Sequence, residues 1–286
     1  MAAYTTNFVE ASGLNVFYRE AGPKDAPVIL LLHGFPSSSH QYRNLIPLLS
    51  QKYHVIAPDL PGFGFTEVPA ELKYKYTFDN LAKSIGAFLD ALSIKKYSVY
   101  VFDYGAPTGF RLALSRPESI QAIISQNGNA YEEGLGDAWA PLKAYWKSGS
   151  NSDREFVRAN VLSLDAVKWQ YDTGSKVPIA PEAPYLDFAL MQRPGNEDIQ
   201  LDLFYDYQNN VTKYPEFHEY FRKSQVPTLV AWGKHDPFFI PPGAEAFKRD
   251  IKETEVHLLD AGHFAVESNA EDIAGLVLKF LEKTGI

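Results

Sequence analysis

The sequence contains no cysteine among its 286 residues, which excludes disulfides, thiolate catalysis and cysteine-bound metal sites. It has no apolar run approaching the roughly 18 residues of a membrane span. Its first residues lack a basic region followed by an apolar core, so we expect no signal peptide. Positive charge is also scarce, because 27 Lys and Arg stand against 35 Asp and Glu, a formal net charge of -8. This balance disfavours nucleic acid and anionic membranes as partners, and we expect a cytoplasmic protein.

Short apolar runs alternate with helical patterns through the first half of the chain and again near its end. Residues 28–32 form a continuous apolar run, which is typical of a strand buried on both faces. From Phe78 to Leu92 the apolar residues recur instead at the spacing of one helix face. Further strands are predicted at residues 14–19, 54–59, 98–102, 120–125, 228–233 and 256–260. This alternation predicts an α/β fold with a mostly parallel sheet covered on both faces.

The pattern changes between Asn127 and about Phe221, where buried-strand runs disappear. Amphipathic, aromatic-rich segments replace them at residues 139–146, 154–169, 185–191 and 199–209. We interpret this stretch as a helical insertion packed over the sheet. The predicted domains are therefore a core of residues 1–127 and 222–286 and a helical cap of residues 128–221.

One short stretch has the pattern of a strand, a sharp turn and a helix. The β-branched and aromatic run 98–102 ends at Asp103, and small residues then open a helical pattern that ends at Ser115. This arrangement is built like a nucleophile elbow, in which a strained corner lifts one side chain above the sheet. Ser is the commonest residue at that corner, and the absence of Ser here argues against a serine esterase. A carboxylate needs no base to act as a nucleophile, so Asp103 suits attack on a carbon that bears a leaving group.

Two further acid–base residues follow predicted strands near the end of the chain. Asp236 comes after the strand at 228–233, and His263 comes after the strand at 256–260. Catalytic groups of open α/β sheets gather at such strand ends. The chain order of nucleophile, acid and histidine is also the order found in α/β-hydrolases. Asp103, Asp236 and His263 are therefore the predicted catalytic residues.

The motifs around these residues resemble those of a known family over essentially the whole chain. The chain is similar to the α/β-hydrolases with an Asp nucleophile, the epoxide hydrolase and haloalkane dehalogenase group. The matching motifs are His33-Gly34-Phe35-Pro36, Asp59-Leu60-Pro61-Gly62-Phe63-Gly64, the elbow at Asp103, Asp236 followed by Pro241, and Gly262-His263-Phe264. The resemblance implies the α/β-hydrolase fold, with a mostly parallel eight-stranded sheet, flanking helices and a helical cap.

The resemblance also implies a two-step reaction without a metal or an organic cofactor. Asp103 displaces a leaving group at carbon and forms an alkyl-enzyme ester. His263, oriented by Asp236, then activates the water that hydrolyses the ester. The backbone N–H groups of Phe35 and Tyr104 are the implied oxyanion hole.

The leaving group divides the family, and here the residues leave more than one possibility open. Epoxide hydrolases use cap tyrosines as acids toward the ring oxygen, and Tyr145 and Tyr207 lie where the family places that pair, with Tyr205 as the substitute. Cap tyrosines also serve simply as packing residues. Haloalkane dehalogenases hold the halide with N–H donors, typically a Trp directly after the nucleophile. That position is Tyr104 here, although a cap residue such as Trp146 offers one donor.

The expected function is hydrolysis of a small apolar epoxide, with haloalkane or haloacid dehalogenation as the alternative. A ligand receptor is the alternative from another class, because a fold does not fix a function. The pocket is expected to be apolar and lined by cap aromatics, for which the candidates are Phe156, Trp169, Phe188 and Phe204. The protein is expected to be a monomer or a homodimer.

Overall fold

The computed structural model describes residues 4–286, so residues 1–3 of the predicted core lie outside it. Its centre is an eight-stranded sheet in the order β1-β2-β4-β3-β5-β6-β7-β8. Pairs β1–β2 and β2–β4 are antiparallel, and the others are parallel. The strands are β1 (Thr5–Ala11), β2 (Leu14–Ala21), β3 (Val28–Leu32), β4 (His54–Pro58), β5 (Tyr97–Val101), β6 (Ile120–Ser125), β7 (Thr228–Gly233) and β8 (Glu255–Leu259). The predicted mostly parallel sheet is confirmed.

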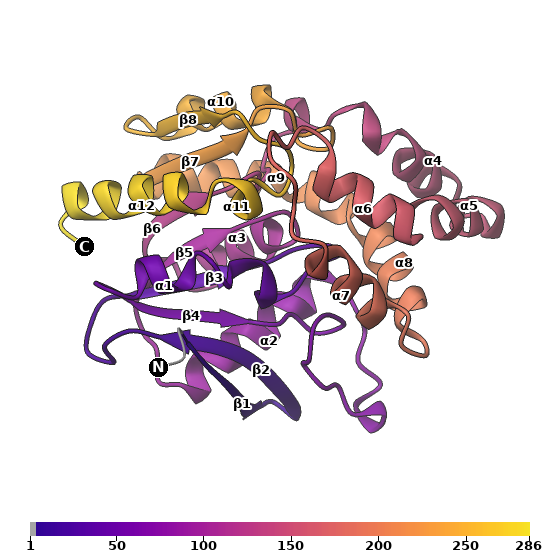
Figure 1. Cartoon of the computed structure of the whole chain (residues 1–286), viewed down its shortest axis with the longest axis horizontal. Helices are drawn as coiled ribbons and strands as arrows, with labels where there is room; N and C mark the ends of the chain where they lie inside the picture. The colour runs from indigo at the N-terminus through magenta and orange to yellow at the C-terminus, as the bar shows by residue number, and fades with distance from the viewer. Residues whose placement is uncertain (1–3) are drawn as a thin grey trace.

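Helices cover both faces of the sheet and give the chain three layers (Figure 1). Helices α1 (Ile46–Leu49), α11 (Ala265–Ser268) and α12 (Ala270–Thr284) cover one face. Helices α2 (Phe78–Ala91), α3 (Gly105–Ser115) and α10 (Pro241–Asp250) cover the other. The central strands β3, β5 and β7 are almost fully buried between the layers, which explains why their sequences are continuous apolar runs.

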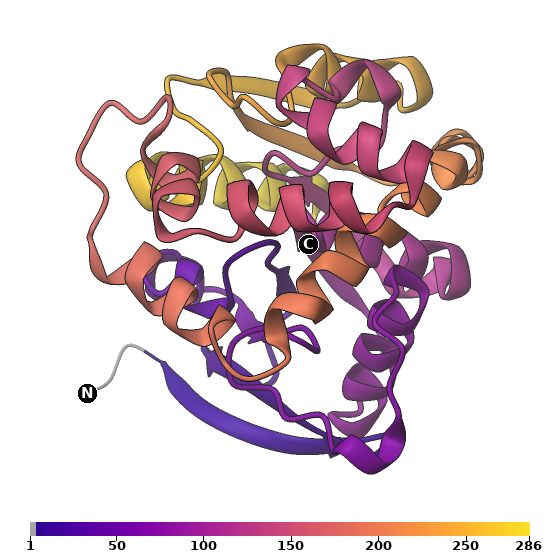
Figure 2. The same ribbon diagram turned by 90° about the vertical axis from the view of Figure 1, so that its right-hand side faces the viewer.

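Between β6 and β7 the chain forms six helices on one side of the sheet (Figures 1 and 2). We call residues 128–221 the cap segment. Its helices are α4 (Ala140–Ser148), α5 (Asn151–Val161), α6 (Leu164–Asp172), α7 (Glu182–Met191), α8 (Asn196–Asp206) and α9 (Gln208–Ser224). The predicted boundary at 221 therefore falls inside α9.

The predicted amphipathic segment 154–169 is divided between two helices, α5 and α6. Ser163 lies in extended backbone between them, and its side chain accepts the Ala166 N–H at 3.2 Å. A serine in this position caps a new helix start.

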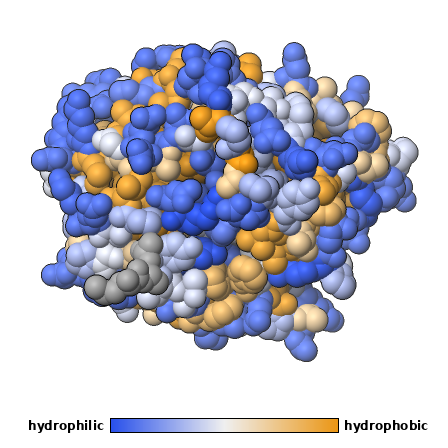
Figure 3. Space-filling view, in the orientation of Figure 1, coloured by the Kyte–Doolittle hydropathy of each residue, from blue (hydrophilic) through white to orange (hydrophobic). Residues whose placement is uncertain are grey.

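None of the helices within residues 4–286 combines the length and apolar composition that a membrane span needs. Figure 3 shows hydrophilic residues over most of one face, with the hydrophobic ones in small groups between them.

The start of α3 is pressed against the end of β3, and this contact requires a glycine. A Cβ on Gly105 would lie 2.1 Å from the Leu32 carbonyl oxygen and 2.9 Å from that of His33. These are backbone atoms of a buried strand end, so they cannot move aside cheaply. Any larger residue would push α3 away from the sheet at the point where the elbow is formed.

We expect Gly105→Ala to destabilise the protein by about 1–3 kcal/mol, the usual cost of overpacking a core. Gly275→Ala in α12 is the matched control, because a Cβ there meets nothing within 4 Å. Replacing Gly by Ala in the middle of a helix stabilises the folded protein by about 0.5–1 kcal/mol. Midpoints of chemical unfolding measure both effects. Equal effects of the two substitutions would contradict the close contact of α3 with β3.

Candidate active site

Asp103 occupies the corner between β5 and α3. Its φ is 44°, in the left-handed region that non-glycine residues rarely adopt. The turn is closed by two short-range bonds, from the Gly105 N–H to the Phe102 carbonyl at 2.7 Å and from the Ala106 N–H to the Asp103 carbonyl at 2.9 Å. Strained backbone of this kind persists where the surroundings hold it and is common at functional sites.

The loop after β3 binds one oxygen of the Asp103 carboxylate. The Phe35 N–H donates to Oδ1 at 2.6 Å, and the backbone N–H of the adjacent Tyr104 acts to lower the pKa of this carboxyl group. A Cβ on Gly34 would lie 2.2 Å from this Oδ1, so a glycine is needed for the loop to come so close. The two N–H groups predicted as an oxyanion hole thus converge on Asp103, and they can stabilise negative charge there.

The other two predicted residues lie beside Asp103, and all three are buried. His263 Nδ1 donates to Asp236 Oδ2 at 2.7 Å. Its Nε2 lies 4.0 Å from Asp103 Oδ2, which is too long for a hydrogen bond. Asp236 is anchored in turn, because its Oδ1 accepts the Phe238 N–H at 2.7 Å. One Asp103 oxygen is therefore held by backbone, and the other faces the imidazole without being bound to it.

Asn127 supports this site, and the sequence analysis did not identify it. It follows β6 with a φ of 47°, and its Nδ2 donates to Asp236 Oδ2 at 2.8 Å. Its Oδ1 accepts the Gly233 N–H at 2.8 Å. In the sequence, Asn127 stands just after a predicted strand and next to Gly128. An Asn in such a turn is a usable indication, because Asn tolerates left-handed backbone better than most residues.

Burial and charge shift the ionisation of the site. Burial raises the pKa of Asp103 to about 6, although the positive charge of His263 and the two backbone N–H groups oppose the shift. Burial acts to lower the pKa of His263, but the charge of Asp236, its hydrogen bond and the charge of Asp103 outweigh it, so this pKa is raised. The imidazole is accordingly a stronger base than a free histidine.

A cavity of about 50 Å³ lies above the elbow. Its walls are mostly apolar and include no Lys or Arg. The lining residues are Phe35, Asp103, Tyr104, Ala138, Trp139, Pro141, Leu142, Val161, Gln170, Phe204, Phe238 and His263. Of the four cap aromatics predicted to line it, only Phe204 does. Phe156 and Trp169 are instead 53% and 47% exposed, because the outer faces of α5 and α6 carry them.

Tyr207 lies behind the cavity wall, with its ring 4.4 Å from that of Trp139 and 5.8 Å from that of Tyr104. It is fully buried, and its hydroxyl makes no hydrogen bond of good geometry within residues 4–286, although the Tyr214 hydroxyl lies close enough to affect its pKa. The buried Tyr104 hydroxyl is likewise unpartnered within this range. Burial raises the pKa of Tyr207 well above its usual value, and the nearby charges of Tyr214 and Asp103 add to the shift. Both phenols are therefore neutral proton donors close to Asp103.

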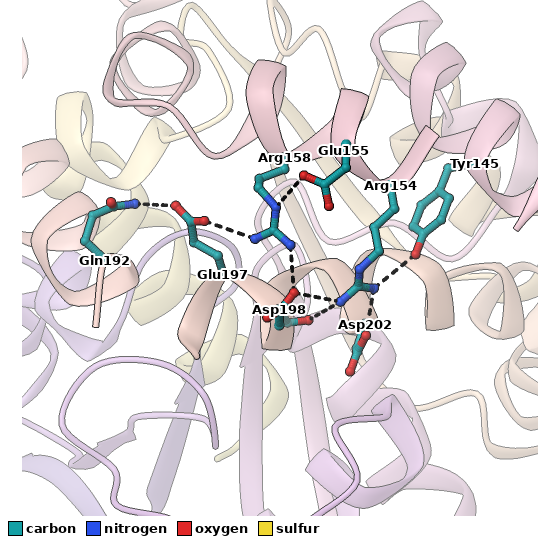
Figure 4. Close-up of polar contacts among 8 residues, drawn as sticks. All are labelled: Tyr145, Arg154, Glu155, Arg158, Gln192, Glu197, Asp198 and Asp202. Carbon is teal, nitrogen blue, oxygen red and sulfur yellow. Dashed lines mark hydrogen bonds and ion pairs between the residues drawn. The ribbon is translucent and has the colours of Figure 1, made fainter. Parts of the chain in front are cut away.

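The structure does not bring Tyr145, Tyr205 or Trp146 to the cavity. The Tyr145 hydroxyl accepts a hydrogen bond from the Arg154 guanidinium at 3.1 Å. This bond lies at the edge of a cluster of ion pairs that joins α5 to α8 (Figure 4). The Tyr205 ring packs 5.0 Å from that of Tyr145 and is 39% exposed. The Trp146 indole donates to the Phe204 carbonyl at 2.7 Å. These three side chains hold cap helices together.

Two further indole N–H groups are also bound to backbone carbonyls. Trp139 donates to the Phe238 carbonyl at 3.0 Å, and Trp232 donates to the Phe239 carbonyl at 2.7 Å.

No group of three or more His, Cys, Asp or Glu in the described part of the chain is arranged to hold a metal ion.

Comparison with known proteins places this geometry in a family. Residues 27–270 match the family described as alpha/beta hydrolase fold. An uncharacterized hydrolase of Saccharomyces cerevisiae, YNR064C, is 54% identical over 270 residues, which cover 92% of this chain and 91% of that protein. A haloalkane dehalogenase of Psychrobacter cryohalolentis is 25% identical over 95% of this chain and 89% of its own length.

Solved structures agree on the fold. The haloalkane dehalogenase DbeA from Bradyrhizobium elkani superposes with a TM-score of 0.82 at 22% identity, covering 99% of both chains. The chain belongs to the α/β-hydrolase family, and it is a hydrolase related to the haloalkane dehalogenases.

Proposed function

We propose that the protein hydrolyses small uncharged epoxides to diols through a covalent ester on Asp103. The observation that carries this proposal is the environment of the Asp103 carboxylate. Its Oδ1 accepts a hydrogen bond from the Phe35 N–H at 2.6 Å. Its Oδ2 lies 4.0 Å from His263 Nε2 and forms no hydrogen bond with it. A buried carboxylate fixed at one oxygen and free at the other suits attack on carbon.

In the first step, Asp103 Oδ2 forms a bond to a ring carbon, and the carbon–oxygen bond of the ring breaks. The ring oxygen takes a proton from a phenol hydroxyl and becomes the hydroxyl of a hydroxyalkyl ester. Tyr207 is the proposed donor, with the Tyr104 hydroxyl beside it. Both phenols are buried, and the charge of Asp103 contributes to the raised pKa of each, so both are neutral and can donate a proton.

In the second step, His263 Nε2 removes a proton from water, and the hydroxide attacks the carboxyl carbon of Asp103. The oxyanion of the tetrahedral intermediate is stabilised by the N–H groups of Phe35 and Tyr104. Collapse of the intermediate releases the diol oxygen, which takes the proton from His263, and the proton left on the Asp103 carboxyl group returns to the phenolate. The Asp236 carboxylate at 2.7 Å stabilises the imidazolium that forms in between.

The donor groups favour epoxide opening over halide release. A halide is held best by N–H donors in the cavity, but three of the four indole N–H groups bind backbone carbonyls, and the fourth belongs to the half-exposed Trp169. An alkoxide needs a proton, which a phenol can supply. Haloalkane dehalogenation is the second candidate, because a relative over nearly the whole chain carries that name.

The test is intact-protein mass spectrometry of His263→Gln after incubation with matched panels of epoxides and haloalkanes. Without its base the enzyme should stop at the ester, because water is no longer activated. We expect a mass gain equal to a whole epoxide, located on Asp103 by peptide mapping.

A gain equal to substrate minus hydrogen halide would instead favour dehalogenation. His263→Gln combined with Asp103→Asn is the control and should gain no mass. Absence of any adduct in folded His263→Gln protein would contradict the Asp103 ester.

We expect Tyr207→Phe to slow ester formation from epoxides on the order of 100-fold, the usual contribution of a general acid. Tyr205→Phe is the matched control, because its exposed ring lies away from the cavity. The rate of adduct growth in the His263→Gln background measures both. Equal rates for the two tyrosine variants would contradict the donor role of Tyr207.

A further inference from the structure

Gln170 is a buried polar residue of the cavity wall that the proposed reaction does not use. It lies on α6 and is only 4% exposed. It lines the cavity together with Asp103 and His263. Of the residues that line the cavity, it is the one with a side-chain amide. Polar groups in a cavity wall are normally paired with the molecule that fills the cavity, so the Gln170 amide is a contact that a substrate can use.

Contacts of the neighbouring residues fix the position of Gln170. The Tyr171 ring stacks on Phe264 at 3.8 Å, and the Trp169 ring meets the edge of Phe238 at 5.5 Å. Both phenylalanines pack against His263 at 5.2 Å. These contacts place this turn of α6 beside the two phenylalanines that pack on His263.

A second network anchors the same turn of α6. The buried Tyr171 hydroxyl donates to Asp187 on α7. The pKa of Asp187 is raised well above its usual value by burial, with the charge of Glu267 adding to the shift. Gln170 is thus placed by rigid neighbours on both sides, and a fixed donor–acceptor pair is more selective than a mobile one.

The charge of the lining shows which polar group Gln170 can bind. No Lys or Arg lines the cavity, and the charge of His263 is already balanced by Asp236 and Asp103, so a carboxylate or phosphate would lie near the ionised Asp103 without a cation of its own. A carboxamide offers both donors and an acceptor, which matches a hydroxyl. The small volume, about 50 Å³, restricts the substrate to a short chain.

We propose that Gln170 determines specificity by binding a neutral hydroxyl on the carbon next to the epoxide ring, so that the preferred substrates are short epoxy alcohols. This inference rests on the proposed epoxide hydrolysis. A purely apolar epoxide would bury the carboxamide without a partner, and a site built to bind a hydroxyl rejects the analogue that lacks it.

The experiment compares glycidol with butylene oxide, which differ by a hydroxyl in place of a methyl group. The measured quantity is the ratio of kcat/KM for the two epoxides, which does not depend on the fraction of folded enzyme. For the wild-type protein we expect the ratio to favour glycidol. In Gln170→Met, which keeps the side-chain length, we expect the ratio to fall at least tenfold through loss of glycidol turnover alone.

Gln200→Met is the matched control. Gln200 is also a buried cap glutamine, but its amide donates to the Gly62 carbonyl at 3.0 Å and it does not line the cavity. Its substitution should leave the ratio unchanged. An unchanged ratio in Gln170→Met, or equal losses on both epoxides, would overturn the specificity role. Failure of the wild-type protein to hydrolyse either epoxide would contradict the proposed function itself, and this inference with it.

Discussion

The close approach of three backbone segments around Asp103 is the constraint on which the site depends. The loop after β3 reaches the carboxylate only because Gly34 has no side chain, and α3 starts beside β3 only because Gly105 has none. Together they hold Asp103 at a positive φ and direct the Phe35 N–H at its Oδ1. The same contacts that strain the backbone also prepare two donors for a negative oxygen, so no reorganisation is needed during reaction.

Charge in this buried site is balanced by a short chain of groups. Asn127 and the Phe238 N–H hold Asp236, Asp236 holds His263, and His263 faces Asp103. Each carboxylate has a donor or a cation within reach, which is what makes buried charge tolerable. The raised pKa of His263 and the unbound Oδ2 of Asp103 are consequences of this arrangement. They supply the base and the nucleophile that the proposed chemistry needs.

The core of the fold and three site residues could be predicted because their signals are local. Buried parallel strands are apolar runs, and Asp103, Asp236 and His263 each follow a predicted strand within a few residues. Strand β1 was missed because, as an exposed edge strand, it buries little apolar surface. The cap was harder, since Tyr145 and Tyr207 look alike in sequence. Only long-range packing places one against Arg154 and the other behind Trp139. Gln170 carries no motif, and its role depends on what surrounds it.

The central claim is that water attacks the Asp103 carboxyl carbon and never the substrate. A single turnover in heavy-oxygen water, with enzyme in excess over epoxide, tests it most directly. The account predicts that the diol from this turnover contains no heavy oxygen, and that the label appears in the peptide containing Asp103. Heavy oxygen in the diol of the first turnover, with an unlabelled Asp103 peptide, would show direct attack by water and contradict the account.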